Sequence, residues 1–394
     1  MSGLLLAAAA PLRAQALPDT LAGGLDATQR DLLDVLFGRK RGDIGAMARA
    51  EPKVQRSILP FIGSNPALGF VGGIAANSTW RGGDPATTSI SSAVASAAYT
   101  TFGQLLTSLK TNVFLPDNRF NFQGDVRYYD TKQPTYGLGP DRPAAGRSEM
   151  DFQLLRVHGT LYRSVGGPLF AGVGYHLDRF AGVSATPAAG QPTSPYADYY
   201  GGAPPDVETA SGLSFDFLYD TRDNPINPAT GYYATAGLRW YTRSQGSTRA
   251  WQAFVGEFRA YPKVAERTVL AFWGYTWFTF GRAPYLALPA ANWDTYSRAS
   301  RGLTQGRVRG TSQAYGEVEV RQGLTADGLF GVVGFFNALT TVEPGTGELS
   351  GFDPGFGVGL RLKLNKRSRT NIALDYGFNR SGSGGLFVNV GEAF

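Results

Sequence analysis

Two arginines between glycines precede a run of charged residues in the segment 304-TQGRVRGTSQAYGEVEVRQGL-324. Arg307 and Arg309 lie between Gly306 and Gly310, and glycines at this spacing indicate a bent loop. Charged residues then alternate with valine, which is typical of a strand with one polar and one apolar face. These charged residues are Glu317, Glu319 and Arg321. Because arginine and carboxylate groups form charge-assisted hydrogen bonds, the loop could be fastened to the polar face of this strand.

Few other residues offer catalytic or metal chemistry. The chain has no cysteine, which excludes disulfides, thiolate catalysis and cysteine-ligated metal sites. The two histidines, His158 and His176, occur within strand-like segments on the polar face, where a histidine is more often a hydrogen-bonded filler than a base. There is no G-x-S-x-G segment. We therefore expect no enzyme, no catalytic residue, no metal and no cofactor.

Composition narrows the remaining classes. Charged residues make up 17% of the 394 residues, against about a quarter in typical soluble proteins. The pI is near 9.4, but Lys and Arg are scattered at strand spacing, so we expect no nucleic-acid partner. No run of about 18 apolar residues is present, so no transmembrane helix is expected.

From residue 54 the chain alternates in hydrophobicity over stretches of about 9–14 residues, which is the pattern of a transmembrane β-barrel. A soluble β-sandwich also alternates, but with its charges outside. Phe, Tyr and Trp recur near the ends of the stretches, as the aromatic girdles of a membrane barrel require, so we favour the barrel. The candidate strands are 54–63, 66–80, 88–101, 104–115, 119–130, 150–164, 168–180, 211–221, 230–243, 250–262, 266–280, 314–323, 329–337, 355–364, 370–378 and 385–394.

This count of sixteen predicts an all-β, closed, antiparallel barrel whose connections differ in length at its two ends. With the N-terminus in the periplasm, the short connections are periplasmic turns, as expected for outer-membrane barrels. The long connections then fall outside, and they are 130–149, 180–210, 280–313 and 338–354. The arginine-bearing segment therefore belongs to an extracellular loop.

The chain divides into three segments. Residues 1–16 end an apolar run with Ala-Gln-Ala, which predicts a signal peptide whose positively charged start is missing. Residues 17–53 are a periplasmic extension in which 26–37 spaces its leucines for one helix face. This helix is either a linker or an amphipathic helix packed on the barrel mouth or the lipid surface. Residues 54–394 are the barrel domain.

The first and last strands would meet at a seam. Pro60 removes a ladder hydrogen bond from the first strand, and Gly391 interrupts the last. A weak seam would expose a strand edge as a template for an incoming strand, whereas an ordinary closure is the alternative. Parity places Phe394 on the lipid face together with Glu392, and such a final aromatic residue resembles the signal that outer-membrane barrels present to their assembly machinery.

The segment 219-YDTRDNPINPATGYY-233 resembles a periplasmic turn of the bacterial surface-antigen barrels, the superfamily of the assembly protein BamA, its relative TamA and the two-partner secretion transporters. Pro225 and Pro228 stiffen this turn, and Gly231 reopens the strand. Three charged residues can either pair across the barrel mouth or only shape the turn. They are Asp220, Arg222 and Asp223.

The arginine-bearing loop strengthens this resemblance. In the family, a long extracellular loop folds into the lumen and carries a Val-Arg-Gly-aromatic tip, which residues 308–310 match, with Thr311 replacing the aromatic. The resemblance implies that Arg309 contacts Glu317 or Glu319 and the strand 331–337, where Asn337 stands in place of the usual aspartate. A generic lumenal salt bridge is the alternative. The predicted latch comprises Arg307, Val308, Arg309, Gly310, Glu317, Glu319, Arg321, Phe336 and Asn337.

The resemblance also implies a function. The roughly 37 residues before the barrel are too few for a POTRA domain, so we expect a short member of the superfamily without such domains. We expect insertion, secretion or lipid transport through the seam, with a passive pore gated by the loop 281–313 as the alternative. The implied partners are the outer-membrane bilayer, lipopolysaccharide, unfolded client proteins and periplasmic accessory proteins, and the implied location is the outer membrane of a Gram-negative bacterium.

Overall fold

The computed structural model describes residues 29–36, 38, 54–65, 69–139, 142–295, 297–342, 347, 349–366, 368–380 and 384–394. The predicted signal peptide and most of the predicted extension lie outside these residues.

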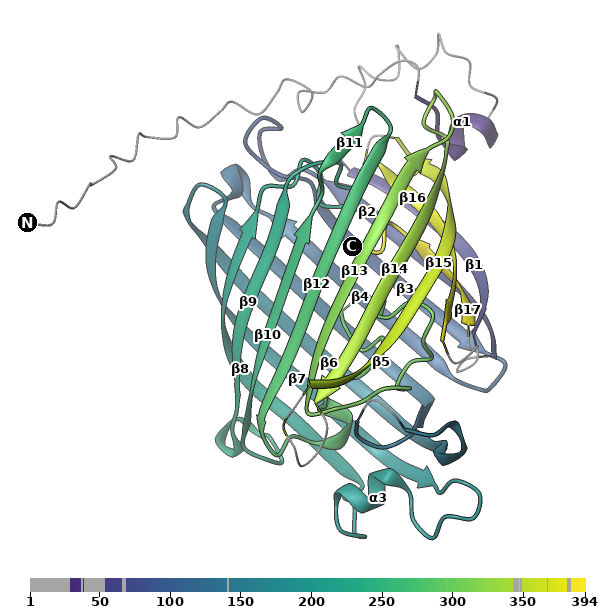
Figure 1. The fold of residues 1–394 in the computed structure, drawn as a ribbon. Coiled ribbons are helices and arrows are strands. Elements are labelled where there is room, and N and C mark those ends of the chain that lie inside the picture. Colours follow the sequence, from purple (N-terminus) through teal and green to yellow (C-terminus); the bar gives the residue numbers. More distant parts are fainter. Residues whose placement is uncertain are drawn as a thin grey trace, which may run out of the picture.

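One antiparallel sheet curls into a barrel in which each strand pairs with the next (Figure 1). The sixteen long strands are β1 (Val54–Asn65), β2 (Gly69–Trp80), β3 (Ser91–Thr100), β4 (Leu105–Phe114), β5 (Phe120–Thr135), β6 (Ser148–Gly166), β7 (Leu169–Thr186), β8 (Val207–Asp220), β9 (Tyr232–Tyr241), β10 (Trp251–Ala260), β12 (Thr268–Gly281), β13 (Ser312–Gly323), β14 (Phe330–Val342), β15 (Leu349–Asn365), β16 (Thr370–Asn379) and β17 (Gly384–Val390). The short β11 (Lys263–Ala265) lies in the turn before β12. The predicted sixteen-stranded barrel is confirmed.

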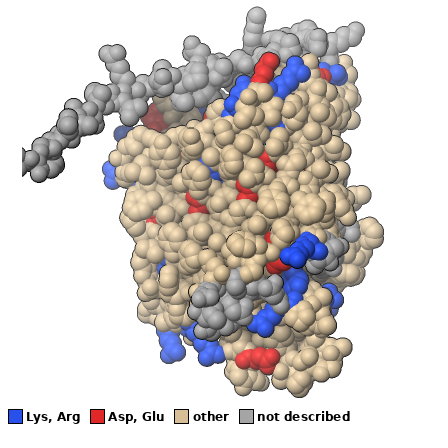
Figure 2. Space-filling model, viewed as in Figure 1, with Lys and Arg blue, Asp and Glu red and all other residues tan. Residues whose placement is uncertain are grey.

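The charged face of the strands points inward. In β13, Val318 and Val320 are 38% and 45% exposed, whereas Glu319 between them is 0% exposed. The alternation therefore puts the valines on the lipid side of the wall and the carboxylates in the lumen. Figure 2 shows mainly uncharged residues over the middle of the wall, with most Lys and Arg near its two ends.

The two ends of the barrel differ as predicted. At one end, which we call the short-turn rim, the strands join through short segments such as 115–119 and 167–168. At the other end, the long-loop rim, the connections include 136–147, 187–206 and 282–311. The helix α3 (Pro195–Tyr199) belongs to the long-loop rim (Figure 1). No helix among the described residues is long and apolar enough to cross a membrane.

Several strands extend further toward the long-loop rim than predicted. The strand predicted over 329–337 runs to Val342 in β14, and the strand predicted from 355 begins at Leu349 in β15. Beyond the lipid, an outward side chain has no reason to be apolar, so the sequence alternation fades before the hydrogen-bonded ladder ends. The predicted long connection 338–354 is therefore wrong, because most of it is strand.

At the short-turn rim, α1 (Leu32–Leu36) is fastened to the turn between β15 and β16 (Figure 1). Lys366 Nζ donates to Asp34 Oδ2 at 2.6 Å, and the Lys366 backbone N–H donates to Asp31 Oδ2 at 3.2 Å. Within the described residues the helix is shorter than the predicted 26–37, whose start lies outside them. Leu36 is exposed.

Candidate functional site: a plugged lumen beside a weak seam

The connection 282–311 between β12 and β13 folds into the lumen, and we call it the plug. Its Trp293 and Leu286 are fully buried and belong to one apolar cluster with inward residues of the wall such as Trp273 and Tyr315. The predicted inward-folded loop is confirmed. The apolar cluster therefore occupies part of a lumen that is too wide, in a sixteen-stranded barrel, for wall side chains alone to fill.

Arg301 of the plug is the centre of a buried ionic network. Its Nη1 donates to Asp375 Oδ2 of β16 at 2.7 Å, and its Nη2 contacts both Glu317 and Glu319 of β13. Its guanidinium carbon lies 3.8 Å from the centre of the Phe335 ring of β14. One arginine thus ties the plug to β13 and β16 through charge-assisted hydrogen bonds and to β14 through a cation–π contact.

The plug approaches the wall closely at Gly302. This residue has φ +102°, and a Cβ placed there would lie 2.8 Å from the Phe378 carbonyl oxygen of β16. The facing wall positions are also glycines, because a Cβ at Gly377 would lie 2.8 Å from Gly302 N and one at Gly355 would lie 2.7 Å from Arg301 O. Because only glycine fits at such positions, these three glycines allow the plug backbone beside Arg301 to lie close to the wall.

The prediction that Arg309 contacts Glu317 or Glu319 is wrong. The Arg309 Nη1 donates instead to the carbonyl oxygens of Tyr285 at 3.0 Å and Leu288 at 3.2 Å, both within the plug. Arg309 is fully buried and shapes the plug internally, with a backbone bridge to Gly139. The carboxylates were identified, but the loop arginine that reaches them is Arg301.

Of the other predicted latch residues, some lie in the plug and others on strands of the wall. Val308 is buried, Gly310 packs against Thr341, and Arg307 Nη2 donates to Arg142 O at 2.7 Å. Asn337 Nδ2 donates to Arg301 O at 3.1 Å, so this position does contact the plug.

Phe336 was predicted as a latch residue and faces outward, 55% exposed. Its neighbour Phe335 faces the lumen and stacks on Arg301. The alternation of β14 explains the correction, because adjacent residues of a strand point to opposite faces.

The ionic network continues toward the last strand. Arg321 Nε donates to Glu319 Oε1 at 2.6 Å, and Arg361 of β15 donates to Asp375 Oδ1 at 2.5 Å and to Glu392 Oε2 at 2.7 Å. Three arginines therefore face four carboxylates in one buried group, which we call the lumenal network. Its members are Arg301, Arg321, Arg361, Glu317, Glu319, Asp375 and Glu392.

Residues 391–394, which we call the tail, turn into the lumen. The strand β17 ends at Val390, and Gly391 adopts φ +96°, which breaks the strand alternation. Phe394 is 4% exposed and stacks on Trp273, with 5.2 Å between the ring centres. The prediction that Phe394 and Glu392 lie on the lipid face is therefore wrong.

The seam between β1 and β17 is held by little backbone pairing. Within the described residues, the register contains the single pair Ser64 and Leu386. On its other side β1 pairs with β2 along its whole length, including Pro60, which faces Ile74. The ladder of the barrel is therefore weakest where its first and last strands meet.

The proline-rich turn at the short-turn rim is held on both sides. Arg222 pairs with Asp220 inside the turn, with Nη2 to Oδ2 at 2.7 Å, and its guanidinium lies over the Tyr233 ring. Asp223 pairs across the mouth with Arg369 of the β15–β16 turn. The turn itself is closed by Pro225, Pro228 and Gly231, the last with φ +98°.

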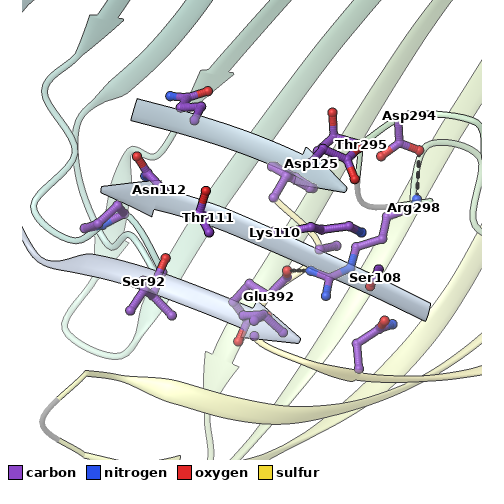
Figure 3. Close-up of a pocket in the computed structure, with 18 of the residues that line it drawn as sticks. Ser92, Ser108, Lys110, Thr111, Asn112, Asp125, Asp294, Thr295, Arg298 and Glu392 are labelled. Carbon is purple, nitrogen blue, oxygen red and sulfur yellow. Dashed lines mark hydrogen bonds between the residues drawn. The ribbon is translucent and has the colours of Figure 1, made fainter. Parts of the chain in front are cut away.

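A cavity of about 630 Å³ remains between the plug and the wall. Figure 3 shows Ser92, Ser108 and Lys110 of adjacent strands facing Asp294 and Arg298 of the plug. The cavity extends to the seam, where its lining includes residues 59–62 of β1 and 388–392 at the end of the chain. It therefore connects the plug with the weakest part of the wall.

The two histidines face the lumen, as their parity predicted. Their rings lie 4.7 Å apart, His158 Nε2 is 3.1 Å from Asp178 Oδ1, and His176 Nε2 is 2.9 Å from Ser214 Oγ. Both side chains have polar neighbours on the wall, in keeping with lumenal filling.

Comparisons place this architecture among known folds. No protein-family model matches the chain, and no curated protein matches it. Among solved structures, BamA from Haemophilus ducreyi lacking POTRA domains 1–3 is 14% identical, with a TM-score of 0.52 over 86% of this chain and 70% of that chain. The chain has the barrel fold of BamA.

The BamA-like fold is also that of CdiB. CdiB from Acinetobacter baumannii is 11% identical, with a TM-score of 0.53 over 87% of this chain and 60% of that chain. CdiB from Escherichia coli is 9% identical, with a TM-score of 0.53 over 86% and 62% of the two chains. The chain thus spans less than two thirds of the CdiB chains. The fold expected from the sequence resemblance is confirmed.

Proposed function

We propose that this BamA-like barrel lies in the bacterial outer membrane and moves client molecules into or across it through the seam between β1 and β17. On this proposal the short-turn rim faces the periplasm, and the partners are outer-membrane lipids and unfolded client proteins. The observation that carries the proposal is that the described residues of β1 and β17 form a single backbone pair. The folds of BamA and CdiB support it by likeness of architecture.

The energetic argument concerns the cost of parting two strands. A backbone hydrogen bond contributes about 1 kcal/mol net, so a ladder of ten pairs is far more costly to separate than one pair. The parted β1 would keep its full ladder with β2 while presenting an unpaired edge. Such an edge is a template for strand addition.

Depletion of the protein followed by proteomics and lipid analysis of the outer membrane tests the function. Loss of other barrels or secreted proteins would support insertion or secretion, and a lipid imbalance would support lipid transport. A passive pore remains the second candidate, because charged side chains such as Lys110, Asp125 and Arg239 line part of the cavity beside the plug. An unchanged outer membrane together with a stable single-channel conductance would favour the pore and reject the seam mechanism.

A further inference from the structure

Three plug residues, Asp294, Thr295 and Arg298, contact strands that lie on opposite sides of the seam. On one side Arg127 of β5, 0% exposed, donates through Nη2 to Asp294 O at 3.2 Å and to Thr295 O. Asp125 fixes this arginine by accepting from its Nε at 2.8 Å and its Nη2 at 2.6 Å. The plug turn 294–298 is therefore anchored to the wall on the N-terminal side of the cavity.

On the other side, Arg298 holds the end of β17. Its guanidinium donates to the carbonyl oxygen of Glu392 through Nη1 and to that of Val390 through Nη2, the second at 3.4 Å. Figure 3 shows Arg298 extending from the plug to Glu392. The turn is stiffened at its base, where Asp294 Oδ1 accepts from the backbone N–H groups of Arg298 and Ala299 at 2.8 Å each.

The tail that Arg298 holds is itself fixed in the lumen. Glu392 accepts from Arg361 and, through Oε1, from Asn371 Nδ2 at 2.5 Å. Gly391 N–H donates to Asn371 O at 2.8 Å. A displacement of the tail therefore also moves the end of β17, because the tail continues directly from Val390.

We propose that the turn 294–298 is a strap that holds the barrel closed from inside, so that the plug and the seam release together. Within the part of the chain that the structure describes, the backbone ladder at the seam is a single pair, whereas the strap joins β5 to β17 through charge-assisted hydrogen bonds at both ends. Parting β17 from β1 moves the tail and breaks the Arg298 contacts. By reciprocity, locking the seam must then stabilise the plug. The purpose of this coupling rests on the proposed function, but the coupling itself requires no client.

The chain has no cysteine, so no native thiol reacts with a labelling reagent and every signal comes from an engineered cysteine. Ser64→Cys with Leu386→Cys links a paired position of the seam, because antiparallel partners lie within disulfide range. Ala291→Cys, at a fully buried plug position, reports plug release by maleimide labelling. The purified barrel is labelled in lipid vesicles at a series of urea concentrations. The series extends to concentrations that release the plug in every variant.

Oxidation of the seam pair is expected to slow labelling at residue 291 at least tenfold at low urea. In Arg298→Ala or Arg127→Ala backgrounds, labelling should be equal in the oxidised and reduced proteins. A control disulfide at the paired positions Val173 and Phe215 of β7 and β8 should leave labelling unchanged. Equal labelling with the strap intact, or a dependence that survives both arginine substitutions, would overturn the strap. Neither result depends on the depletion experiment.

Discussion

Arg301→Ala tests whether the lumenal network fixes the plug. In the native barrel three arginines form ion pairs with four buried carboxylates, and Arg301 contacts three of these carboxylates. The substitution leaves two arginines for the same four carboxylates, all of them almost fully buried. Breaking a buried ion pair by removing one partner costs about 3–5 kcal/mol, because the other charge stays uncompensated. We therefore expect the unfolding equilibrium constant to rise by roughly two to three and a half orders of magnitude.

The assay is urea unfolding in lipid vesicles, followed by tryptophan fluorescence, since Trp293 of the plug is buried against the wall. The matched control is Arg147→Ala, whose ion pair with Glu149 is half exposed at the long-loop rim. An exposed pair contributes at most about 1 kcal/mol. Glu317→Gln combined with Arg301→Ala should recover part of the loss, because it removes one uncompensated charge.

A destabilisation by Arg301→Ala no larger than that by Arg147→Ala would show that the lumenal network does not fix the plug. Failure of Glu317→Gln to recover any stability would show that the cost comes from a packing defect and not from charge. Arg309→Ala serves as a further comparison, because it removes hydrogen bonds to carbonyl oxygens within the plug. It should leave the carboxylates paired.

Three further outcomes follow from the same geometry. Gly302→Ala, at φ +102° and against a backbone oxygen, should cost about 1–3 kcal/mol in the same unfolding assay, whereas Gly316→Ala, where a Cβ meets open space, should not destabilise. Phe394→Ala should cost about 3 kcal/mol, as expected for a buried ring, and a change below 0.5 kcal/mol, on the order of a surface substitution, would contradict its lumenal position. Lys366→Met removes the partner of Asp34, so a protease added at the short-turn rim should cleave near α1 faster than in the native barrel. Equal cleavage rates would show that this contact does not hold the helix.

The strands were predictable because lipid and lumen impose opposite chemistry on alternate residues. That constraint marks every strand where it crosses the apolar layer and disappears beyond it, as in β14 and β15. The inward carboxylates Glu317 and Glu319 followed from the same alternation, and the structure brings them together as predicted.

The arginine that meets them could not be chosen from the sequence alone. The plug contains two Arg-Gly pairs, at 301–302 and 309–310, and an irregular loop has no period that fixes which way a side chain points. The close fit of Gly302 against Gly377 and Gly355 determines which arginine reaches the carboxylates, and these glycines are distant in sequence. Glycines at lumen-facing positions of two adjacent strands were the available signal for a close approach.

The tail was misplaced because strand parity was extended through Gly391. A residue at φ +96° reverses the chain direction locally, so the faces beyond it no longer follow the strand. A signal was present, since Glu392 is a charge on a face predicted to meet lipid. Its position in the lumen, paired with Arg361, removes that conflict.

A reversible lock on the seam shows whether the proposed function requires opening between β1 and β17. Cells depleted of the native protein would receive the Ser64→Cys, Leu386→Cys variant or the control pair at Val173 and Phe215. We expect the oxidised seam variant to leave the outer-membrane composition unrestored, a reductant to restore it, and the control pair to restore it in both states. Full restoration by the oxidised seam variant would show that the barrel functions without opening between β1 and β17.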